Sequence, residues 1–229
     1  MDEKHYQRDF LLDLCSHVKD CETKTGLSVL PSLQPVFQSA PAVWSIDLSE
    51  RKTSILLELL KLQPEKKQVE LTGCSHEESE VRSLLQCLPF ISQLSVDRNQ
   101  LLRFIHCCAA CDVQQEAASG LLRTLQHSLD LSCSSCVELP EEDQTEPLSL
   151  TADDCRAVST ILTQGSRDTQ LDLRDCEVED SVLDLLFPVL HRVRLRVSNT
   201  VLLQLLSLVP VNSERDAVRR AVSLCTALG

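Results

Sequence analysis

Glycine is scarce in this chain, with 5 glycines among 229 residues. Glycine supplies the positive φ angles of tight hairpin turns and of the loops that cradle phosphate groups. Its shortage therefore disfavours an all-β fold built from many hairpins. The five glycines stand apart from one another and none precedes a lysine, so the sequence contains no G-x-x-x-x-G-K-[ST] phosphate loop.

Long apolar runs are also missing. No run approaches the roughly 18 residues that a membrane span needs, and the first nine residues lack the apolar core of a signal peptide. The 12 cysteines would suit a disulfide framework only in an oxidising compartment. Cys15 and Cys87 instead lie inside apolar helical patterns, where a reduced cysteine acts as a small hydrophobic residue. We expect a cytoplasmic chain with reduced cysteines and no membrane partner.

Basic residues are outnumbered, with 22 Lys and Arg against 34 Asp and Glu and a net charge of −12. Without an overall positive field to attract phosphates, nucleic acid is not an expected partner. At 43% hydrophobic and 24% charged residues, the composition is that of a folded chain with a sizeable core.

Motifs of hydrolytic catalysis are absent, because the sequence contains neither G-x-S-x-G nor H-E-x-x-H. Ser75 with Glu78 and Thr151 with Asp154 fit the [ST]-x-x-[DE] pattern that caps helix N-termini. The acidic pairs at these helix starts are thus expected to complement the helix dipole. We predict a chain that is not an enzyme and that has no cofactor.

An internal duplication dominates the sequence. Short strand-like stretches around Ile46, Val69 and Leu94, each followed by a helical pattern, recur 102, 102 and 101 residues later at Leu148, Leu171 and Leu195. Helical positions keep the same register, since Leu101 and Leu102 correspond to Leu202 and Leu203. The two copies cover about residues 43–108 and 148–208. A further strand is expected at 128–132, between them.

A strand and a helix that repeat every 22 to 25 residues predict parallel strands joined by helical crossovers. Such units stack into a curved solenoid with short parallel strands inside and helices outside. We therefore expect an irregular α/β repeat array over 43–208. A helical flank or cap is expected at 1–42, and a second helix or cap at 209–229.

The strand motifs resemble the leucine-rich repeat. They are Val69-x-Leu71-x-x-Cys74, Leu171-x-Leu173-x-x-Cys176, Ile46-x-Leu48 and Leu129-x-Leu131. The helical backs resemble the ribonuclease-inhibitor type, found also in the carboxy-terminal arrays of NOD-like immune receptors, and most closely those of fishes. Lys66 and Asp168 replace the leading leucine of the full pattern, and helical pairs interrupt the array.

This resemblance implies a protein-recognition module of a cytoplasmic NOD-like-receptor-type innate immune protein, acting in ligand sensing or autoinhibition. Its partner would be a protein or another domain of the same receptor, bound through the concave strands. A stand-alone inhibitor or adaptor is the alternative. If the receptor resemblance holds, the nucleotide-binding domain lies outside this sequence.

Charge on the concave strands is the strongest functional feature. Strand alternation should place one set of side chains on the concave face. These residues are Asp47, Glu70, Thr72, Asp172, Arg174, Arg192, Arg194 and Arg196. Arg192, Arg194 and Arg196 would form a basic stripe beside acidic residues, and segregated charge of this kind steers protein partners. A solvated face without a partner is the competing interpretation.

A zinc site is the weak alternative. Cys108-x-x-Cys111 and Cys133-x-x-Cys136 approach the spacing of a zinc ribbon. However, Cys108 and Cys111 fall in an alanine-rich helical run, and the last copy of this segment carries leucine and valine instead. We therefore interpret these cysteines as packing residues and predict no metal.

Overall fold

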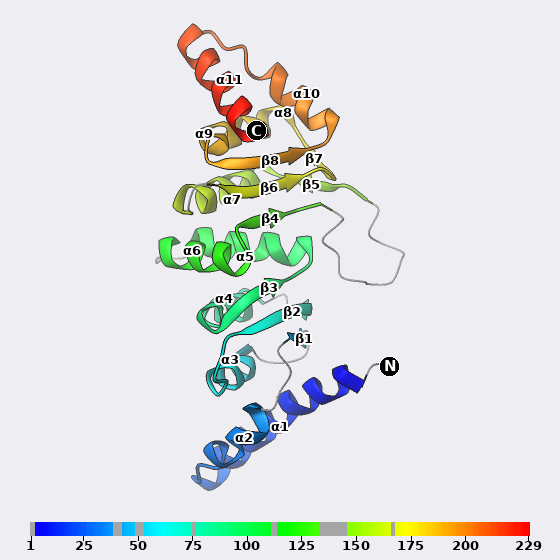
Figure 1. Ribbon diagram of the computed structural model, residues 1–229, viewed down its shortest axis with the longest axis vertical. Helices are drawn as coiled ribbons and strands as arrows, with labels where there is room; N and C mark the ends of the chain where they lie inside the picture. Colours follow the sequence, from blue (N-terminus) through cyan, green and yellow to red (C-terminus); the bar gives the residue numbers. More distant parts are fainter. Residues whose placement is uncertain are drawn as a thin grey trace. The chain divides into compact units, whose positions relative to one another are not determined.

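The computed structural model describes residues 3–38, 43–48, 53–74, 77–110, 114–132, 146–165 and 168–229. The chain divides into two compact units, with the boundary between Val96 and Asp97. Each unit is α/β, with short parallel strands and helices, as predicted (Figure 1). In the described part of the chain, no helix has the length and apolar character needed to cross a bilayer.

Unit 1 begins with helical segments and continues into a sheet. Its helical elements are α1 (Glu3–Thr25), η1 (Leu30–Leu33), α2 (Gln34–Gln38), α3 (Thr53–Lys61), α4 (Glu78–Leu85) and η2 (Leu88–Phe90). Its strands are β1 (Val43–Leu48), β2 (Lys67–Cys74) and β3 (Ile91–Ser95). The strands form a parallel sheet in the order β1-β2-β3, here called sheet A. Figure 1 shows α3 and α4 to one side of it.

Alternation along the strands builds the core of unit 1. Ile46 on β1, Val69 and Leu71 on β2, and Leu94 on β3 are buried, while the residues between them on β2 and β3 are half-buried or exposed. Apolar residues spaced three or four apart on α3 and α4, including Leu56 and Leu84, are buried as well. The expected period of two in strands and 3.6 in helices is therefore met.

Unit 2 contains two sheets. Its helical elements are α5 (Arg98–Ala110), α6 (Gln114–Thr124), α7 (Ala152–Gln164), α8 (Asp180–Leu183), η4 (Asp184–Leu186), α9 (Phe187–Leu190), α10 (Asn199–Ser207) and α11 (Glu214–Leu228). Its strands are β4 (Ser128–Asp130), β5 (Leu148–Leu150), β6 (Thr169–Leu173), β7 (Cys176–Val178) and β8 (Val193–Val197). Sheet B has the parallel order β4-β6-β8, and β5 pairs in parallel with β7.

The second copy is arranged differently from the first. By position in the duplication β5 corresponds to β1 and β6 to β2, but β1 pairs with β2 whereas β5 pairs with β7 and β4 lies beside β6. A strand has two hydrogen-bonding edges, and β4 and β8 occupy both edges of β6. The segment that follows the turn after β6 is the partner that remains for β5.

The pairing of the next strand is the same in both copies. Val69 lies opposite Leu94 in sheet A, and Leu171 lies opposite Leu195 in sheet B. The capping box predicted from Thr151 and Asp154 is confirmed at the start of α7, where Asp154 N donates to Thr151 Oγ1 and Thr151 N donates to Asp154 Oδ2. Ser75 of the other predicted box lies outside the described residues.

Candidate functional site

The strands of sheet B bring two polar rows together. Ser128, Gln170 and Arg194 lie in register across β4, β6 and β8, and so do Asp130, Asp172 and Arg196. These six residues, together with Arg174 beyond the end of β6, are called the sheet B face. Between them along the strands lie the buried residues Leu129, Leu171 and Leu195, which point into the core.

Arg194 and Arg196 are the accessible charges of the sheet B face. Both are exposed, and the side chain of Arg194 is 77% exposed. Its Nε lies 4.0 Å from Oδ1 of Asp168, which is itself exposed. An ion pair so open to water has little energetic weight. The two guanidinium groups, two residues apart on one strand, therefore remain accessible to a ligand.

Asp172 does not face solvent as alternation predicts, because its side chain is 1% exposed. Arg174 covers it: Nε donates to both carboxylate oxygens at 3.0 and 3.1 Å, Nη2 donates to Oδ2 at 2.8 Å, and the backbone N donates at 3.2 Å. A buried carboxylate needs such donors to offset its lost hydration. The predicted exposure of Asp172 is thus wrong, and its charge is internally paired.

The charge of Asp172 also acts on its partner. The side-chain hydrogen bond and the negative charge of Asp172 raise the pKa of Arg174, and the nearby Asp130 and Asp175 add to this effect. Arg174 is therefore a positive group committed to its own sheet. The half-exposed guanidinium adds little net charge to the sheet B face, because the carboxylate of Asp172 balances it.

Arg192 stands apart from the predicted basic stripe. It precedes β8, and its guanidinium donates to the backbone oxygens of Thr163 and Gly165 at the end of α7. The last carbonyl groups of a helix have no partners within the helix, and a positive side chain complements them. The stripe is therefore reduced to Arg194 and Arg196, because helix capping takes up the charge of Arg192.

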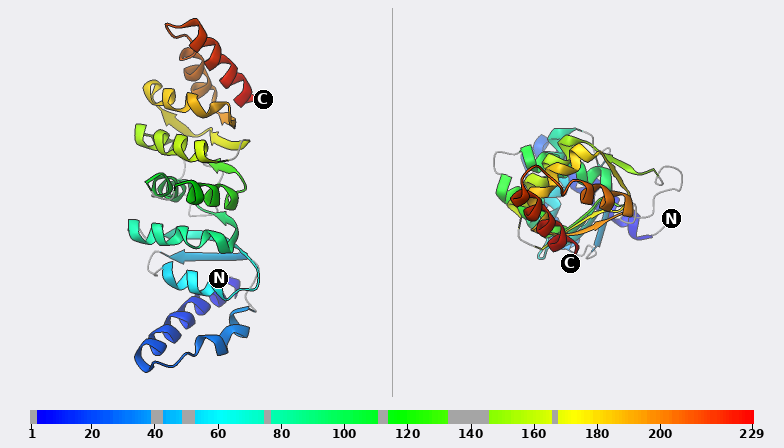
Figure 2. Two further views of the ribbon diagram at one scale, coloured as in Figure 1. Left: turned by 90° about the vertical axis from the view of Figure 1, so that its left-hand side faces the viewer. Right: turned by 90° about the horizontal axis from the view of Figure 1, so that it is seen from above.

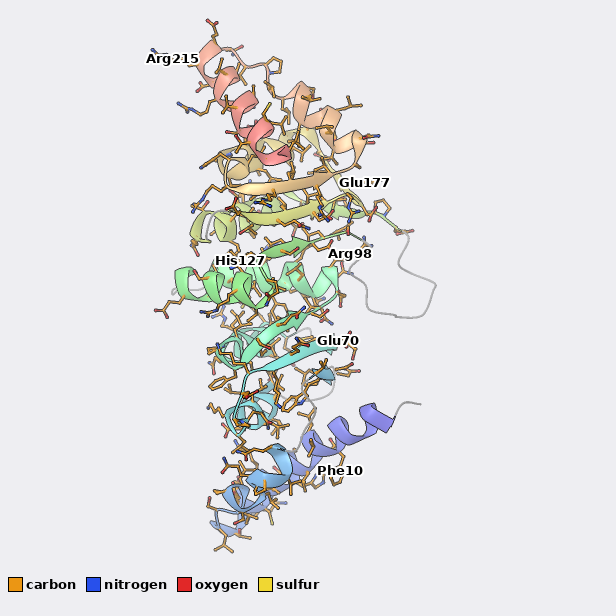
Figure 3. All side chains as sticks on the ribbon, in the orientation of Figure 1. Phe10, Glu70, Arg98, His127, Glu177 and Arg215 are labelled. Atoms are coloured by element: carbon orange, nitrogen blue, oxygen red, sulfur yellow. The ribbon has the colours of Figure 1, made fainter. Side chains whose placement is uncertain are left out.

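The remaining predicted residues belong to sheet A in unit 1. Asp47 is exposed, Glu70 is half-buried, and Thr72 Oγ1 donates to the backbone oxygen of Ile46 at 3.2 Å. Glu70 is labelled on β2 in Figure 3. The eight predicted residues thus fall into two groups, three in unit 1 and five in unit 2. We describe these groups separately.

Sequence reasoning missed Ser128, Gln170 and the role of Asp168. Asp168 has a left-handed backbone, with φ of 71°, and its N donates to the backbone oxygen of Arg192. Aspartate tolerates this conformation better than most residues do. An aspartate in place of the usual leading leucine was the signal that could have indicated a turn here.

The cysteine cluster gives no metal site in the described part of the chain. Cys108 is buried, whereas Cys111, Cys133 and Cys136 lie outside the described residues. Where residues are described, no group of three or more His, Cys, Asp or Glu side chains is placed to hold a metal ion. Burial raises the pKa of Cys87 to about 12 and that of Cys155 to about 11, so both thiols stay protonated at neutral pH.

A cavity of 710 Å³ lies in unit 2, lined by residues of η4, α9 and α11 that include Asp184, Phe187, Asp216 and Arg220. Arg220 is occupied on three sides: Nη1 lies 2.6 Å from Asp184 Oδ1, the same atom donates to Leu208 O, and the guanidinium lies 4.8 Å from the Phe187 ring centre. These contacts hold α11 in place. Arg220, the most buried charged residue of the cavity lining, is therefore already paired within the protein.

Comparisons with protein-family models, with curated proteins and with solved structures found no match to this chain. A functional proposal therefore depends on the geometry of the sites themselves. Among the surfaces described, the sheet B face alone combines adjacent exposed arginines with a rigid strand backbone.

Proposed function

We propose that this chain is a non-enzymatic protein-recognition module and that the sheet B face is its binding surface. The observation that carries the proposal is the exposure of Arg194 and Arg196 side by side on β8, in a chain whose net charge is −12. Arginine is enriched at protein interfaces, and its planar guanidinium matches a carboxylate in two-point contact. The partner segment therefore carries carboxylates opposite these two residues.

The surroundings of Arg194 and Arg196 favour a binding surface over a solvated face without a partner. β8 is hydrogen-bonded to β6 over its full length, from Val193 to Val197. The Asp172–Arg174 pair occupies the neighbouring positions without competing for Arg194 or Arg196. A backbone held in this way loses little conformational freedom when a partner binds, which leaves more of the interaction energy as affinity.

We further propose that the two units belong to a curved leucine-rich repeat solenoid of the ribonuclease-inhibitor and NOD-like-receptor type, with the strands on its concave side. The matching strand registers support this assignment. So do the buried Cys74 and Cys176, which end the motifs that begin at Val69 and Leu171. Cys176 Sγ lies 3.5 Å from the backbone oxygen of Leu131, as expected of a turn residue tucked under a strand. The partner is then a protein, or another domain of the same receptor, in the cytoplasm.

The test compares a charge reversal on sheet B with the introduction of the same acidic residues at the equivalent positions of sheet A. In Arg194→Glu/Arg196→Glu the sheet B face is reversed, and in Gln93→Glu/Ser95→Glu the same strand positions of sheet A are changed. Purified tagged protein of each kind is used to capture partners from cell extract, with quantification by mass spectrometry. We expect the sheet A variant to capture the same partners as the unaltered chain. The captured amount of these partners should fall by about tenfold or more with the sheet B variant.

Thermal unfolding of both variants serves as the control for folding. All four positions are half-buried or exposed, so neither variant should lose much stability. An identical set and amount of captured proteins for all three chains would contradict the proposal.

A further inference from the structure

Helices α5 and α10 occupy equivalent places in the two copies. Asp97 Oδ1 accepts from the backbone N of Asn99 and Gln100 at the start of α5. Ser198 Oγ, 101 residues later, accepts from Val201 N at the start of α10. Equivalent N-caps fix the register of the two helices. The residues of α5 and α10 can therefore be compared one by one.

One stripe of α5 is covered by α7. His106 Nε2 lies 2.6 Å from Asp154 Oδ1 in the first turn of α7, so this side of α5 faces α7. Leu102 lies four residues before His106 and three before Ile105, so it joins the two side chains into one stripe, and Leu102 and Ile105 are both buried, with Ile105 at 0% exposed. Figure 2 shows α7 beside α5 and α6, and α7 packs against both.

The buried side of α7 is mostly aliphatic. Its buried residues include Ala157, Val158, Ile161 and Leu162. The packing is close at its end as well, since a Cβ at Gly165 would collide with Cδ1 of Leu122 on α6. Residues three and four apart, such as Ala157, Val158 and Ile161, form the ridges that pack into the groove of another helix.

The equivalent stripe of α10 is exposed. Leu203, which corresponds to Leu102, is 67% exposed, and Leu206, which corresponds to Ile105, is 49% exposed. Ser207, at the position of His106, is exposed too. On the inner face, Leu205 is buried like its counterpart Phe104. Figure 1 shows α10 and α11 at the end of unit 2. Two leucines are thus left on the surface where the first copy has a helix packed.

We propose that the α10 stripe, formed by Leu203, Leu206 and Ser207, is a docking site for an amphipathic α-helix of a partner protein. The occupant is a helix because the equivalent stripe of α5 is filled by one. Its contacting face carries aliphatic residues at the spacing found on α7. This site is separate from the sheet B face and does not depend on the function proposed for it.

The probe is a synthetic peptide with the sequence of residues 151–165, which comprises α7 and its two capping residues, with Cys155 replaced by serine and a fluorescent label at one end. Its anisotropy is followed while the full chain is added at up to about 1 mM. We expect saturable binding that weakens about tenfold or more in Leu203→Asp/Leu206→Asp. A peptide with Val158→Asp/Ile161→Asp is the matched control and should not bind.

Three outcomes would overturn the proposal. They are the absence of saturable binding, equal binding to the unaltered chain and to Leu203→Asp/Leu206→Asp, and a dimer of the chain that this double variant abolishes. The last outcome would assign the stripe to a second copy. If the aspartates lower thermal stability, Leu203→Gln/Leu206→Gln gives the same comparison. Arg194→Glu/Arg196→Glu should leave peptide binding unchanged, which separates this test from that of the sheet B face.

Discussion

Sheets A and B share a strand register but not a polar face. Glu70 on β2 lies opposite Ser95 on β3. At the equivalent positions of sheet B, Asp172 on β6 lies opposite Arg196 on β8. Gln68 and Gln93 pair in sheet A, with Gln68 Nε2 donating to Gln93 Oε1 at 3.4 Å, where sheet B has Gln170 and Arg194. Sheet A thus presents one amide, Gln93, and one hydroxyl, Ser95, at the positions where sheet B presents two arginines.

The difference shows which positions the fold controls. Buried strand residues are aliphatic in both sheets, as with Val69 and Leu171 or Leu94 and Leu195, because they supply the core. The intervening positions carry no such constraint and differ in charge. One sheet can therefore acquire a charged surface while its pairing stays the same.

The largest effect is expected where equivalent positions differ in burial. Ile91 of β3 is buried, whereas Arg192, 101 residues later, caps α7. Ile91→Ala should lower the free energy of unfolding by about 2–5 kcal/mol through lost burial and a residual cavity. Arg192→Ala should cost about 1–2 kcal/mol, since it removes partly exposed hydrogen bonds. Urea unfolding measures both values.

The rate of thiol labelling then shows which unit each of the two substitutions destabilises. The protonated, buried thiols of Cys87 in unit 1 and Cys155 in unit 2 react only when their surroundings open. Ile91→Ala should speed labelling of Cys87 more than that of Cys155, and Arg192→Ala should do the reverse. Equal acceleration at both cysteines would mean that the units do not respond separately.

The next effect compares two equivalent carboxylates. Asp172→Asn removes a buried charge that accepts several hydrogen bonds and should cost about 1.5–3 kcal/mol, toward the lower value because Arg174 is half exposed. Glu70→Gln, at a half-buried site, should change stability by less than about 0.5 kcal/mol. Thermal and urea unfolding of the two variants give the comparison, and equal losses would contradict the distinction between the sheets.

The smallest effect tests the same contrast between a sheltered and an open carboxylate on α7. Burial acts to raise the pKa of Asp154, but hydrogen bonds from His106 and Thr151 outweigh it, so the pKa is lowered. A lowered pKa means that Asp154 stabilises the fold above its unfolded pKa of about 3.9. That contribution is lost as the pH falls through the lower, folded value.

The stability of the unaltered chain relative to Asp154→Asn should thus shrink as the pH falls below about 4. Asp153→Asn is the matched control, because Asp153 is an exposed neighbour in the same helical turn. Unfolding measured as a function of pH gives both curves. A constant difference across the acid range would show that the bonds of Asp154 do not depend on its charge.

Much of the secondary structure was predictable because burial leaves a period in the sequence. The strands around Val69 and Leu171 and the helices that follow Thr53 and Thr151 lie where the alternating and helical patterns predict them. The candidate site was predictable only in part. Arg194 and Arg196 are exposed as expected. Arg192 depends on Gly165, 27 residues earlier, and Asp172 is buried because Arg174 folds back over it, which strand alternation does not predict.

The sequence alone determined the α/β class, the repeat and the identity of the core residues, because apolar periodicity is a local property of the chain. Tertiary structure decided which strand edges were already occupied, so that β5 pairs with β7 and not with β6. It also decided which charges remain accessible. The guanidinium of Arg192 is taken up by carbonyl oxygens at the end of α7, because packing brings Thr163 and Gly165 within reach although they lie 29 and 27 residues earlier in the chain.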